Sequence, residues 1–552
     1  MKKESFYRLY PIAGFALFFL LFLIPVCITL SQAFIEDGSA TFAVVLETFS
    51  NPYYLKIMTF TLLQALISTL AALALGLPGA YLMTTYRFPG KKLLKALYSV
   101  PFVLPSILVV LGFVIFYGNS GFLNKALMAI FKLKEPPLKI LYSFTAVIMA
   151  HAFYNFPVII SLVSEYWQKL DYSCERAALT LGSKKFKVFR TITLPRLRPA
   201  ILSAASLVFL FCFTSFAIIL VLGGGPSLTT TEVEIYRLAR ISMDTSQACA
   251  LSLFSMVVAI LVLALYSAAQ NKQNSLNKGE SIKQSQSKVQ RKPKTFLQHF
   301  VIIIYLVFSL LFILCPILSI LARSFLGSTS RASGYSWSLS AYVKLFQIGS
   351  SNLKAILNSV IIALVASILA AGAALRICTY IVKDKRGGVA VDVVLMLPMV
   401  ISSVIIGLSY FIISKYLKFI PSIVLIILAH TVIIMPFIIR TILPVYRKIP
   451  ESLVNASRTM GYSARATFLH VERPLLRPAL LTGMVFSFVM SIGELNATLL
   501  LGSSSYQTLP VQIYRLISAY NYQGACAMGC ILIVICFIVF LITEALKRRS
   551  YV

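Results

Sequence analysis

Ionisable side chains inside apolar stretches are the first candidates for chemistry in this sequence. Glu494 lies in the run SIGELNATLLLG, and His151 and His430 each occur in an Ala-His-x5-Pro context. A group that can carry charge at membrane depth is costly to bury, so each is a functional candidate. Glu494 could line a polar path and attract a cation, or pair with a neighbouring helix. For the histidines, repetition favours a hydrogen bond that fixes helix packing.

The sequence lacks the patterns of catalytic and metal sites. It contains no phosphate-binding GxxxxGK[ST] run, no His/Glu spacing of a metal site and no nucleophile triad. Its nine cysteines are scattered without a CxxC pair, so they predict no disulfide framework. We therefore expect that the chain is not itself an enzyme and that it holds no cofactor or metal.

One polar, basic stretch occurs twice. Residues 170–199 read LDYSCERAALTLGSKKFKVFRTITLPRLRP, and residues 449–478 read IPESLVNASRTMGYSARATFLHVERPLLRP. A constant offset of 279 residues (177 to 456) aligns Ala177 with Ala456, Gly182 with Gly461, Pro195 with Pro474, His151 with His430, and Gly223 with Gly502. The chain is therefore an internal duplication.

The repeated stretch predicts a helix, a glycine turn and a second amphipathic helix before Pro195. Asp171 can cap the first helix, and Gly182 suits the left-handed conformation that ends it. Ala177 and Ala178 leave a low-profile crest, which a groove of another protein could approach closely. Alternatively, both copies merely connect membrane helices and are basic for that reason.

Composition places the chain in the membrane. Of its 552 residues, 59% are hydrophobic and 12% are charged, whereas a soluble domain carries roughly 25% charged residues. The formal charge of +32 follows from basic loops on the cytosolic side of a membrane protein, so we expect a lipid bilayer and no nucleic acid as partner. The predicted fold is an all-α integral membrane protein of about twelve helices in two pseudo-symmetric six-helix halves.

Twelve apolar runs are long enough to span a bilayer. They cover residues 10–34, 57–85, 96–117, 140–164, 199–221, 246–269, 298–322, 355–382, 391–414, 421–443, 478–501 and 523–546. An even number puts both ends on one side, and the basic residues near both ends make that side cytosolic. The loop after the third span is also basic, although this topology turns it outward.

The duplication predicts a division into three parts. Residues 271–297 are rich in Ser, Gln and Lys and lack periodic apolar positions, as in a flexible cytosolic linker. Residues 1–270 and 298–552 would then be the two transmembrane domains. The first half also carries about 18 extra residues, because Pro101 aligns with Pro398 at a larger offset than the histidines do. Within residues 118–137 an amphipathic pattern predicts a short external surface helix.

The repeated stretch resembles a known signature, EAA-x3-Gly-x9-Ile-x-Leu-Pro, of permease subunits of binding-protein-dependent ABC importers. Ala177, Ala178 and Gly182 match it, as do Ile192, Leu194 and Pro195. The Glu position holds Arg176, with Glu175 one residue earlier, and Asn455 in the second copy. The resemblance covers essentially the whole chain.

That resemblance implies a type I ABC importer permease in a bacterial cytoplasmic (inner) membrane. It implies two copies of an ATP-binding subunit, which bind the ATP and Mg that this chain lacks, and a substrate-binding protein outside. It assigns the coupling loops, where the ATPase docks, to Glu175, Ala177, Ala178, Gly182, Pro195, Asn455, Ala456, Gly461 and Pro474. Other residues are candidates for the pathway: Glu494, and Gly223, Gly224 and Gly225 as a tight turn or outer gate.

Residues 207–238 are similar to the fused permeases of bacterial importers for thiamine and its phosphate esters, and ferric-iron importers use a closely similar permease. The resemblance therefore favours thiamine as cargo, with ferric iron as the alternative. A different class, an ion-coupled secondary transporter, would need intramembrane carboxylates as coupling sites. Glu494 is the one residue that supports that class. A secondary transporter would also leave the two matched loops unexplained.

Overall fold

The computed structural model describes residues 5–36, 39–280, 290–293, 295–328, 335–383, 388–502 and 506–550. In these ranges the chain is almost entirely helical, apart from two short antiparallel hairpins. Eleven of the described helices are long and apolar enough to cross a membrane, or twelve if one sharply bent pair counts as a single span. The all-α membrane fold with about twelve spans is confirmed.

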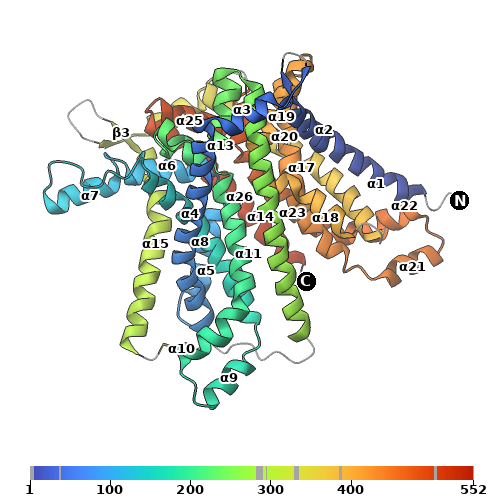
Figure 1. Cartoon of the computed structure of the whole chain (residues 1–552), viewed down its shortest axis with the longest axis horizontal. Helices are drawn as coiled ribbons and strands as arrows, with labels where there is room; N and C mark the ends of the chain where they lie inside the picture. The colour runs from blue at the N-terminus through green and yellow to red at the C-terminus, as the bar shows by residue number, and fades with distance from the viewer. Residues whose placement is uncertain are drawn as a thin grey trace. The chain divides into compact units, whose positions relative to one another are not determined.

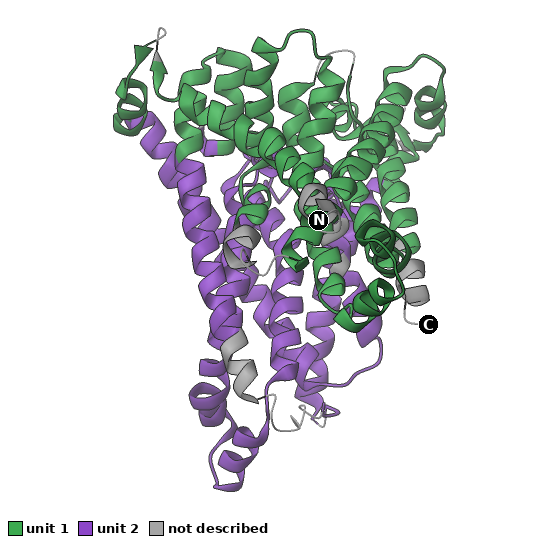
Figure 2. Cartoon of the chain, turned by 90° about the vertical axis from the view of Figure 1, so that its right-hand side faces the viewer, with its two compact units in different colours: residues 1–51, 232–253, 321–552 green, residues 52–231, 254–320 purple. Residues whose placement is uncertain are grey.

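The helices gather into two compact units, shown separately by colour in Figure 2. Unit 2 comprises residues 52–231 and 254–320. Its elements are α4 (Pro52–Thr85), α5 (Lys91–Val103), α6 (Ser106–Tyr117), α7 (Phe122–Phe131), α8 (Phe144–Lys169), α9 (Ser173–Thr180), α10 (Lys185–Val188), the π-helical turn η2 (Phe189–Thr193), α11 (Leu194–Phe213), α12 (Ala217–Leu222), the 3-10 turn η3 (Pro226–Leu228), and most of α14 (Thr245–Glu280) and α15 (Phe296–Ser324).

Unit 1 comprises residues 1–51, 232–253 and 321–552. It begins with α1 (Ser5–Phe18), η1 (Phe19–Leu23), α2 (Ile24–Gln32), the hairpin β1 (Ile35–Glu36) and β2 (Ser39–Ala40), α3 (Ala43–Ser50), α13 (Thr231–Arg237) and η4 (Leu238–Ser242). It continues with β3 (Leu326–Ser328), β4 (Tyr335–Trp337), α16 (Ser340–Phe346), α17 (Ser351–Lys383), α18 (Gly388–Val400), α19 (Ser403–Tyr416), α20 (Ser422–Tyr446), α21 (Glu451–Thr459), α22 (Ala464–Thr467), η5 (Phe468–Glu472), α23 (Arg473–Ile492), α24 (Asn496–Leu501), α25 (Leu509–Ser518) and α26 (Tyr522–Ser550).

Each compact unit contains the first span of the other half of the sequence. The span α1 of the first half belongs to unit 1, and most of α15, the first span of the second half, belongs to unit 2. In unit 1, α1 packs on α17, where the rings of Phe15 and Tyr380 meet edge to face at 4.9 Å. In unit 2, α15 packs on the helices of the first half, where the Tyr305 hydroxyl donates to the Leu75 carbonyl at 2.8 Å. The predicted sequence domains, 1–270 and 298–552, describe the duplication and stay a prediction.

The third span of each half is broken where the sequence predicts a continuous helix. In the run 96–117, Pro105 forces Leu104 out of the helical region, so α5 ends at Val103 and α6 begins at Ser106. In the run 391–414, the segments 394–400 and 403–416 meet at an angle of 99°. At that second break the Ser402 hydroxyl accepts from the Val404 amide and starts α19.

The predicted linker differs from expectation at its start. α14 continues to Glu280, beyond the predicted boundary at residue 270. Residues 281–289 and 294, which make up much of the predicted linker, lie outside the described residues. The helical extension has a simple cause, because this stretch contains neither Pro nor, before Gly279, a Gly that would end a helix.

Candidate functional site

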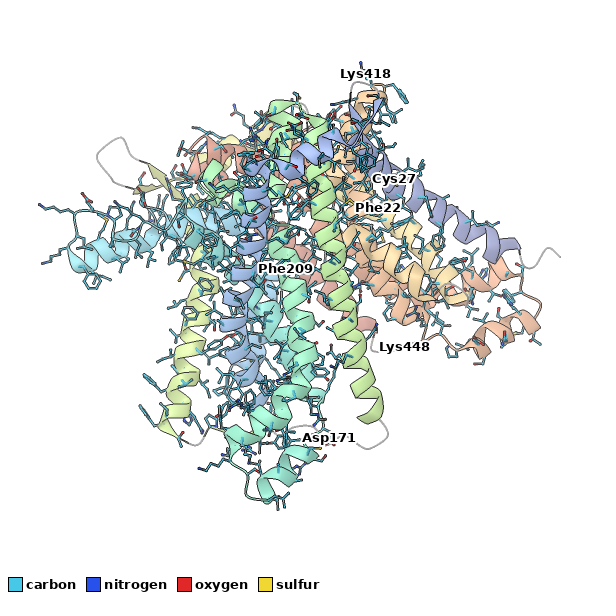
Figure 3. The ribbon with its side chains drawn as sticks, viewed as in Figure 1. Phe22, Cys27, Asp171, Phe209, Lys418 and Lys448 are labelled. Carbon is cyan, nitrogen blue, oxygen red and sulfur yellow. The ribbon has the colours of Figure 1, made fainter. Side chains whose placement is uncertain are left out.

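The duplicated polar stretch forms the same structure in both units. We call residues 170–199 the first knob and residues 449–478 the second knob. The first knob follows α8 in unit 2, and Asp171 marks its beginning in Figure 3. There the Asp171 carboxylate accepts the Ser173 amide at 3.0 Å and the Ser173 hydroxyl at 2.5 Å. These bonds hold the pKa of Asp171 below its usual range. The charged carboxylate thus binds the first amide of α9 from the residue before the cap position, which Tyr172 occupies.

Gly182 ends α9 in the left-handed conformation that the sequence predicts, with φ +84°. The Gly182 amide donates to the Leu179 carbonyl at 3.1 Å, and the Ser183 amide donates to the Ala178 carbonyl at 3.1 Å. This pair of bonds is the Schellman arrangement, which satisfies the last carbonyls of a helix. A side chain at Gly182 would meet nothing within 4 Å, so the backbone conformation, and not crowding, requires glycine here.

The second knob repeats this geometry. Gly461 has φ +90° and open space around it. Its amide donates to the Arg458 carbonyl at 3.0 Å, and the Tyr462 amide donates to the Ser457 carbonyl at 3.2 Å. Each bond joins the residues that correspond, at the offset of 279, to those bonded in the first knob.

The crest of each knob is exposed. Ala177, Asn455 and Ala456 lie open to solvent, as do both glycines, Pro195 and Pro474, while Ala178 is half-buried. The residue before each glycine is a large apolar one: Leu181 is 86% exposed and Met460 is 79% exposed. Sequence reasoning missed this pair, although the same offset aligns them. An apolar side chain held in water at equivalent points of two loops suits insertion into a protein groove.

Glu175 belongs to the first knob but faces inward. Its side chain is buried and its carboxylate accepts a 2.7 Å hydrogen bond from the Thr193 hydroxyl in η2. In the second knob the buried carboxylate is that of Glu472, which forms an ion pair with Lys383 and accepts from the Tyr446 hydroxyl at 2.9 Å. Glu175 and Glu472 therefore brace the knobs from within and leave the outer surface to other residues.

Glu494 lies in the break between α23 and α24. Its carboxylate accepts the amides of Asn496 and Ala497 at 2.9 and 3.0 Å, and so caps α24. The Asn496 side chain in turn donates to the Ser403 hydroxyl at the start of α19. Glu494 is half-buried. It therefore has a structural partner, the next helix, and places its carboxylate at a bend in the span.

A second carboxylate of unit 1, that of Glu232, lies at the start of α19, next to Ser403. Ser402, beside Ser403, donates its hydroxyl to Glu232 of α13, which is fully buried. Glu234 is buried as well and forms a bidentate pair with Arg237, at 2.6 and 2.9 Å. Neither Glu232 nor Glu234 reaches the surface, so these two carboxylates offer no acidic surface to a binding protein.

The glycine run at the end of α12 forms a tight turn. Gly224 has φ +74° and Gly225 has φ +118°. A side chain on Gly224 would lie 2.7 Å from the Cβ of Tyr142, so close backbone packing requires glycine there. Gly223 closes α12 with a 2.9 Å bond from its amide to the Ile219 carbonyl. The geometry shows the turn that the sequence predicts.

The two histidines are packing residues, as the sequence favoured. His151 Nδ1 lies 3.0 Å from the Ser68 hydroxyl between α8 and α4. His430 bridges Ser491 and Thr498, with both contacts at 2.8 Å. Both histidines are 1% exposed. Each links helices of its own unit.

Unit 1 also holds a small basic cavity of about 150 Å³. Its lining includes two cations and three phenols, together with apolar and amide groups: Tyr236, Arg240, Thr498, Leu499, Gly502, Tyr506, Gln507, Val511, Tyr514 and Arg515. The Arg240 guanidinium donates to the Gly502 carbonyl at 3.1 Å, which fixes one wall. Tyr236 and Tyr514 are the matching tyrosines of the runs VEIYRL (residues 233–238) and VQIYRL (residues 511–516), so corresponding segments of both copies line the cavity within this unit.

Comparison with known proteins gives one family. A family model described as "Binding-protein-dependent transport system inner membrane component" matches residues 72–274 and 363–550. The chain is 27% identical over 89% of its length to the thiamine transport system permease protein ThiP of Haemophilus influenzae, covering 88% of that protein. It is 24% identical to ThiP of Escherichia coli, over 91% of this chain and 90% of that one.

A second kind of relative is also similar. The ferric transport system permease protein FbpB of Actinobacillus pleuropneumoniae is 26% identical, over 85% of this chain and 67% of its own. Among solved structures, a chain of a bacterial ABC transporter for import of alginate matches with a TM-score of 0.42 and 18% identity, over 50% of this chain and 97% of that chain.

Proposed function

This chain belongs to the family of binding-protein-dependent transport system inner membrane components, and from that premise we propose that it conducts thiamine or a thiamine phosphate ester. Membership makes it a multi-pass permease of an ABC importer, not itself an ATPase, with an ATP-binding subunit and a binding protein as partners. The proposal adds the cargo, the number of ATPases and the residues that receive them.

The observation that carries the coupling mechanism is the repeated geometry of the two knobs. Each presents an exposed crest, a left-handed glycine and an exposed apolar side chain at one position, Leu181 or Met460. One ATP-binding subunit docks on each knob, so one permease chain takes two. ATP and Mg bind to those subunits. Closure of the ATPase pair moves the knobs, and the buried braces transmit that motion to the helices.

The bracing groups explain how the motion is transmitted. Thr193, which holds Glu175, is the last residue before α11, and Glu472, which holds Lys383, is the last before α23. α11 and α23 are both broken spans that continue as α12 and α24. Force applied at a knob therefore reaches a jointed helix directly, and the joint in the second copy contains Glu494.

Glu494 is the pathway residue of this proposal. The residue is half-buried, and its carboxylate lies at a joint of a membrane helix. Thiamine carries a permanent positive charge, so a carboxylate at membrane depth would lower the barrier to its passage. Gly223, Gly224 and Gly225 form the turn after the equivalent helix α12, where they serve as the outer gate when both chain ends are cytosolic.

The cargo is tested by ATP hydrolysis. The chain, its ATPase subunit and its binding protein are reconstituted in nanodiscs, with the binding protein empty, loaded with thiamine or loaded with ferric iron. Stimulation by the thiamine-loaded protein alone supports the proposal. Stimulation by the iron-loaded protein alone replaces the cargo with ferric iron, the cargo named for the FbpB relative. Uptake that is unaffected by ATP depletion and abolished by an ionophore would instead indicate a secondary transporter.

A further inference from the structure

The extra segment of the first half forms a short helix, α7, as the sequence predicts. In Figure 1, α7 extends sideways from the end of unit 2 where α6 ends and lies crosswise to α4, α8 and α15. The first knob lies at the other end of α8. α7 takes no part in the transport mechanism proposed above.

The fold fixes the position of α7. Asn124 is 1% exposed, and its amide nitrogen donates to the Gly118 carbonyl at 2.9 Å and to the Leu138 carbonyl at 2.8 Å. Its amide oxygen accepts from the Leu138 amide at 3.0 Å. A single buried side chain therefore joins the segments before and after the helix. The orientation of α7 is set by this clasp.

The clasp holds the free end of the helix away from the bundle, with its apolar side chains exposed. Ile130 is 71% exposed, Phe131 is 65% exposed and Leu133 is 42% exposed. Such a cluster is unfavourable in water. Large apolar side chains are also exposed on the span α15 of the same unit, at Phe308, Leu311 and Leu318.

Positive charge accompanies this apolar end. Lys132, Lys134 and Lys139 are exposed, and Glu135 is the one acidic residue among residues 118–143. A basic amphipathic helix with large apolar side chains is the composition of elements that lie in the membrane interface. Lysines beside such a surface attract anionic lipid headgroups.

We propose that α7 and the loop through Lys139 lie in the headgroup layer and bind anionic lipid. Ile130, Phe131 and Leu133 enter the upper acyl region, about 5–10 Å below the headgroups. The three exposed lysines meet headgroup phosphates. This assignment also accounts for a basic loop on the outer side of the predicted topology. It needs only that the chain spans a membrane, so it stands or falls independently of the cargo.

Depth is measured with a spin label. Ile130→Cys is labelled in a Cys27→Ser/Cys174→Ser background, since those two cysteines are exposed. Leu311→Cys in α15 is the lipid reference, and Leu181→Cys in the first knob is the water reference. In nanodiscs, the label at 130 should be accessible to oxygen and protected from a water-soluble nickel chelate, as at 311. Nickel accessibility equal to that at 181 would overturn the proposal.

Lipid charge is tested with the same label. Nanodiscs of phosphatidylcholine alone are compared with nanodiscs that contain phosphatidylglycerol, in which nickel accessibility at 130 should fall several-fold. Lys132→Gln/Lys134→Gln/Lys139→Gln should abolish the difference, whereas the matched triple Lys184→Gln/Lys185→Gln/Lys187→Gln should keep it. Equal accessibility in both lipids overturns the headgroup assignment. Protection that arises only on adding the binding protein overturns it too, because α7 would then be a protein contact.

Discussion

The hydroxyl of Thr193 donates a 2.7 Å hydrogen bond to the carboxylate of Glu175, and both side chains are buried in the first knob. Glu175 lies on the exposed helix α9 and Thr193 lies at the foot of α11, so the bond joins the knob to a membrane helix. At the equivalent positions the second knob has Val454 and Glu472. The buried carboxylate of the first knob therefore lies on its first helix, α9, whereas that of the second knob lies on η5, at the foot of the membrane helix α23.

Thr193→Val should loosen the first knob. Valine has nearly the same shape, but the buried carboxylate of Glu175 loses its hydroxyl donor, which costs roughly 1–3 kcal/mol. We expect faster proteolysis between α9 and α11 and less transport per ATP hydrolysed. Thr191→Val is the control, because its exposed hydroxyl bonds only to the Lys187 carbonyl of the same helix. Equal effects of both substitutions would contradict a bracing role for Thr193.

Gly182→Val should uncouple ATP hydrolysis from transport. A non-glycine residue in the left-handed region costs roughly 1–2 kcal/mol, and a β-branched one is especially unfavourable there. Gly182→Asn tolerates the same φ and faces the same open space, so it should retain most coupling. The measurement is cargo moved per ATP hydrolysed. Normal uptake by the valine variant would contradict the role of the knob.

Glu494→Gln separates charge from capping. The amide oxygen can still accept from Asn496 and Ala497, so stability should change little, while uptake of a cationic cargo should fall several-fold. Glu494→Ala should lose the cap too, at about 1 kcal/mol, and melt at a lower temperature. Uptake and thermal unfolding are measured for both. If the glutamine variant transports normally, Glu494 is a helix cap alone.

Lys91 should behave as a reactive amine. Burial, aided by the charge of Lys95, lowers the pKa of Lys91 to about 8, and its amine donates to the Tyr86 carbonyl at 2.8 Å. The unfolded chain therefore binds more protons above pH 8, so this group contributes stability that grows as pH rises from about 8 toward the usual lysine value.

Acetylation at pH 8.5, followed by peptide mass spectrometry, checks this prediction. The folded protein should be acetylated at Lys91 faster than at the exposed neighbour Lys92, and denaturation should remove the difference. Equal rates in the folded protein would contradict the lowered pKa.

Local features of this protein follow from its sequence, whereas long-range contacts do not. Hydropathy located the spans, and the place of Gly182 after a predicted helix indicated its left-handed conformation. The fixed offset put Gly461 at the equivalent position. The buried carboxylate of Glu232 has its partner, Ser402, 170 residues away, which no local pattern reveals. The packing of α1 in unit 1 and of α15 in unit 2 also depends on long-range contacts, so the local sequence does not predict it. Of the helix breaks, that at Pro105 was readable from the proline alone.

The stoichiometry of the complex shows whether each knob receives one ATPase subunit. The purified chain is saturated with its ATP-binding subunit, and the mass of the complex is measured by light scattering. We expect two ATPase subunits per chain, one when either Gly182 or Gly461 is replaced by valine, and none when both are. Two subunits on the doubly substituted chain, folded as judged by thermal unfolding, would contradict it.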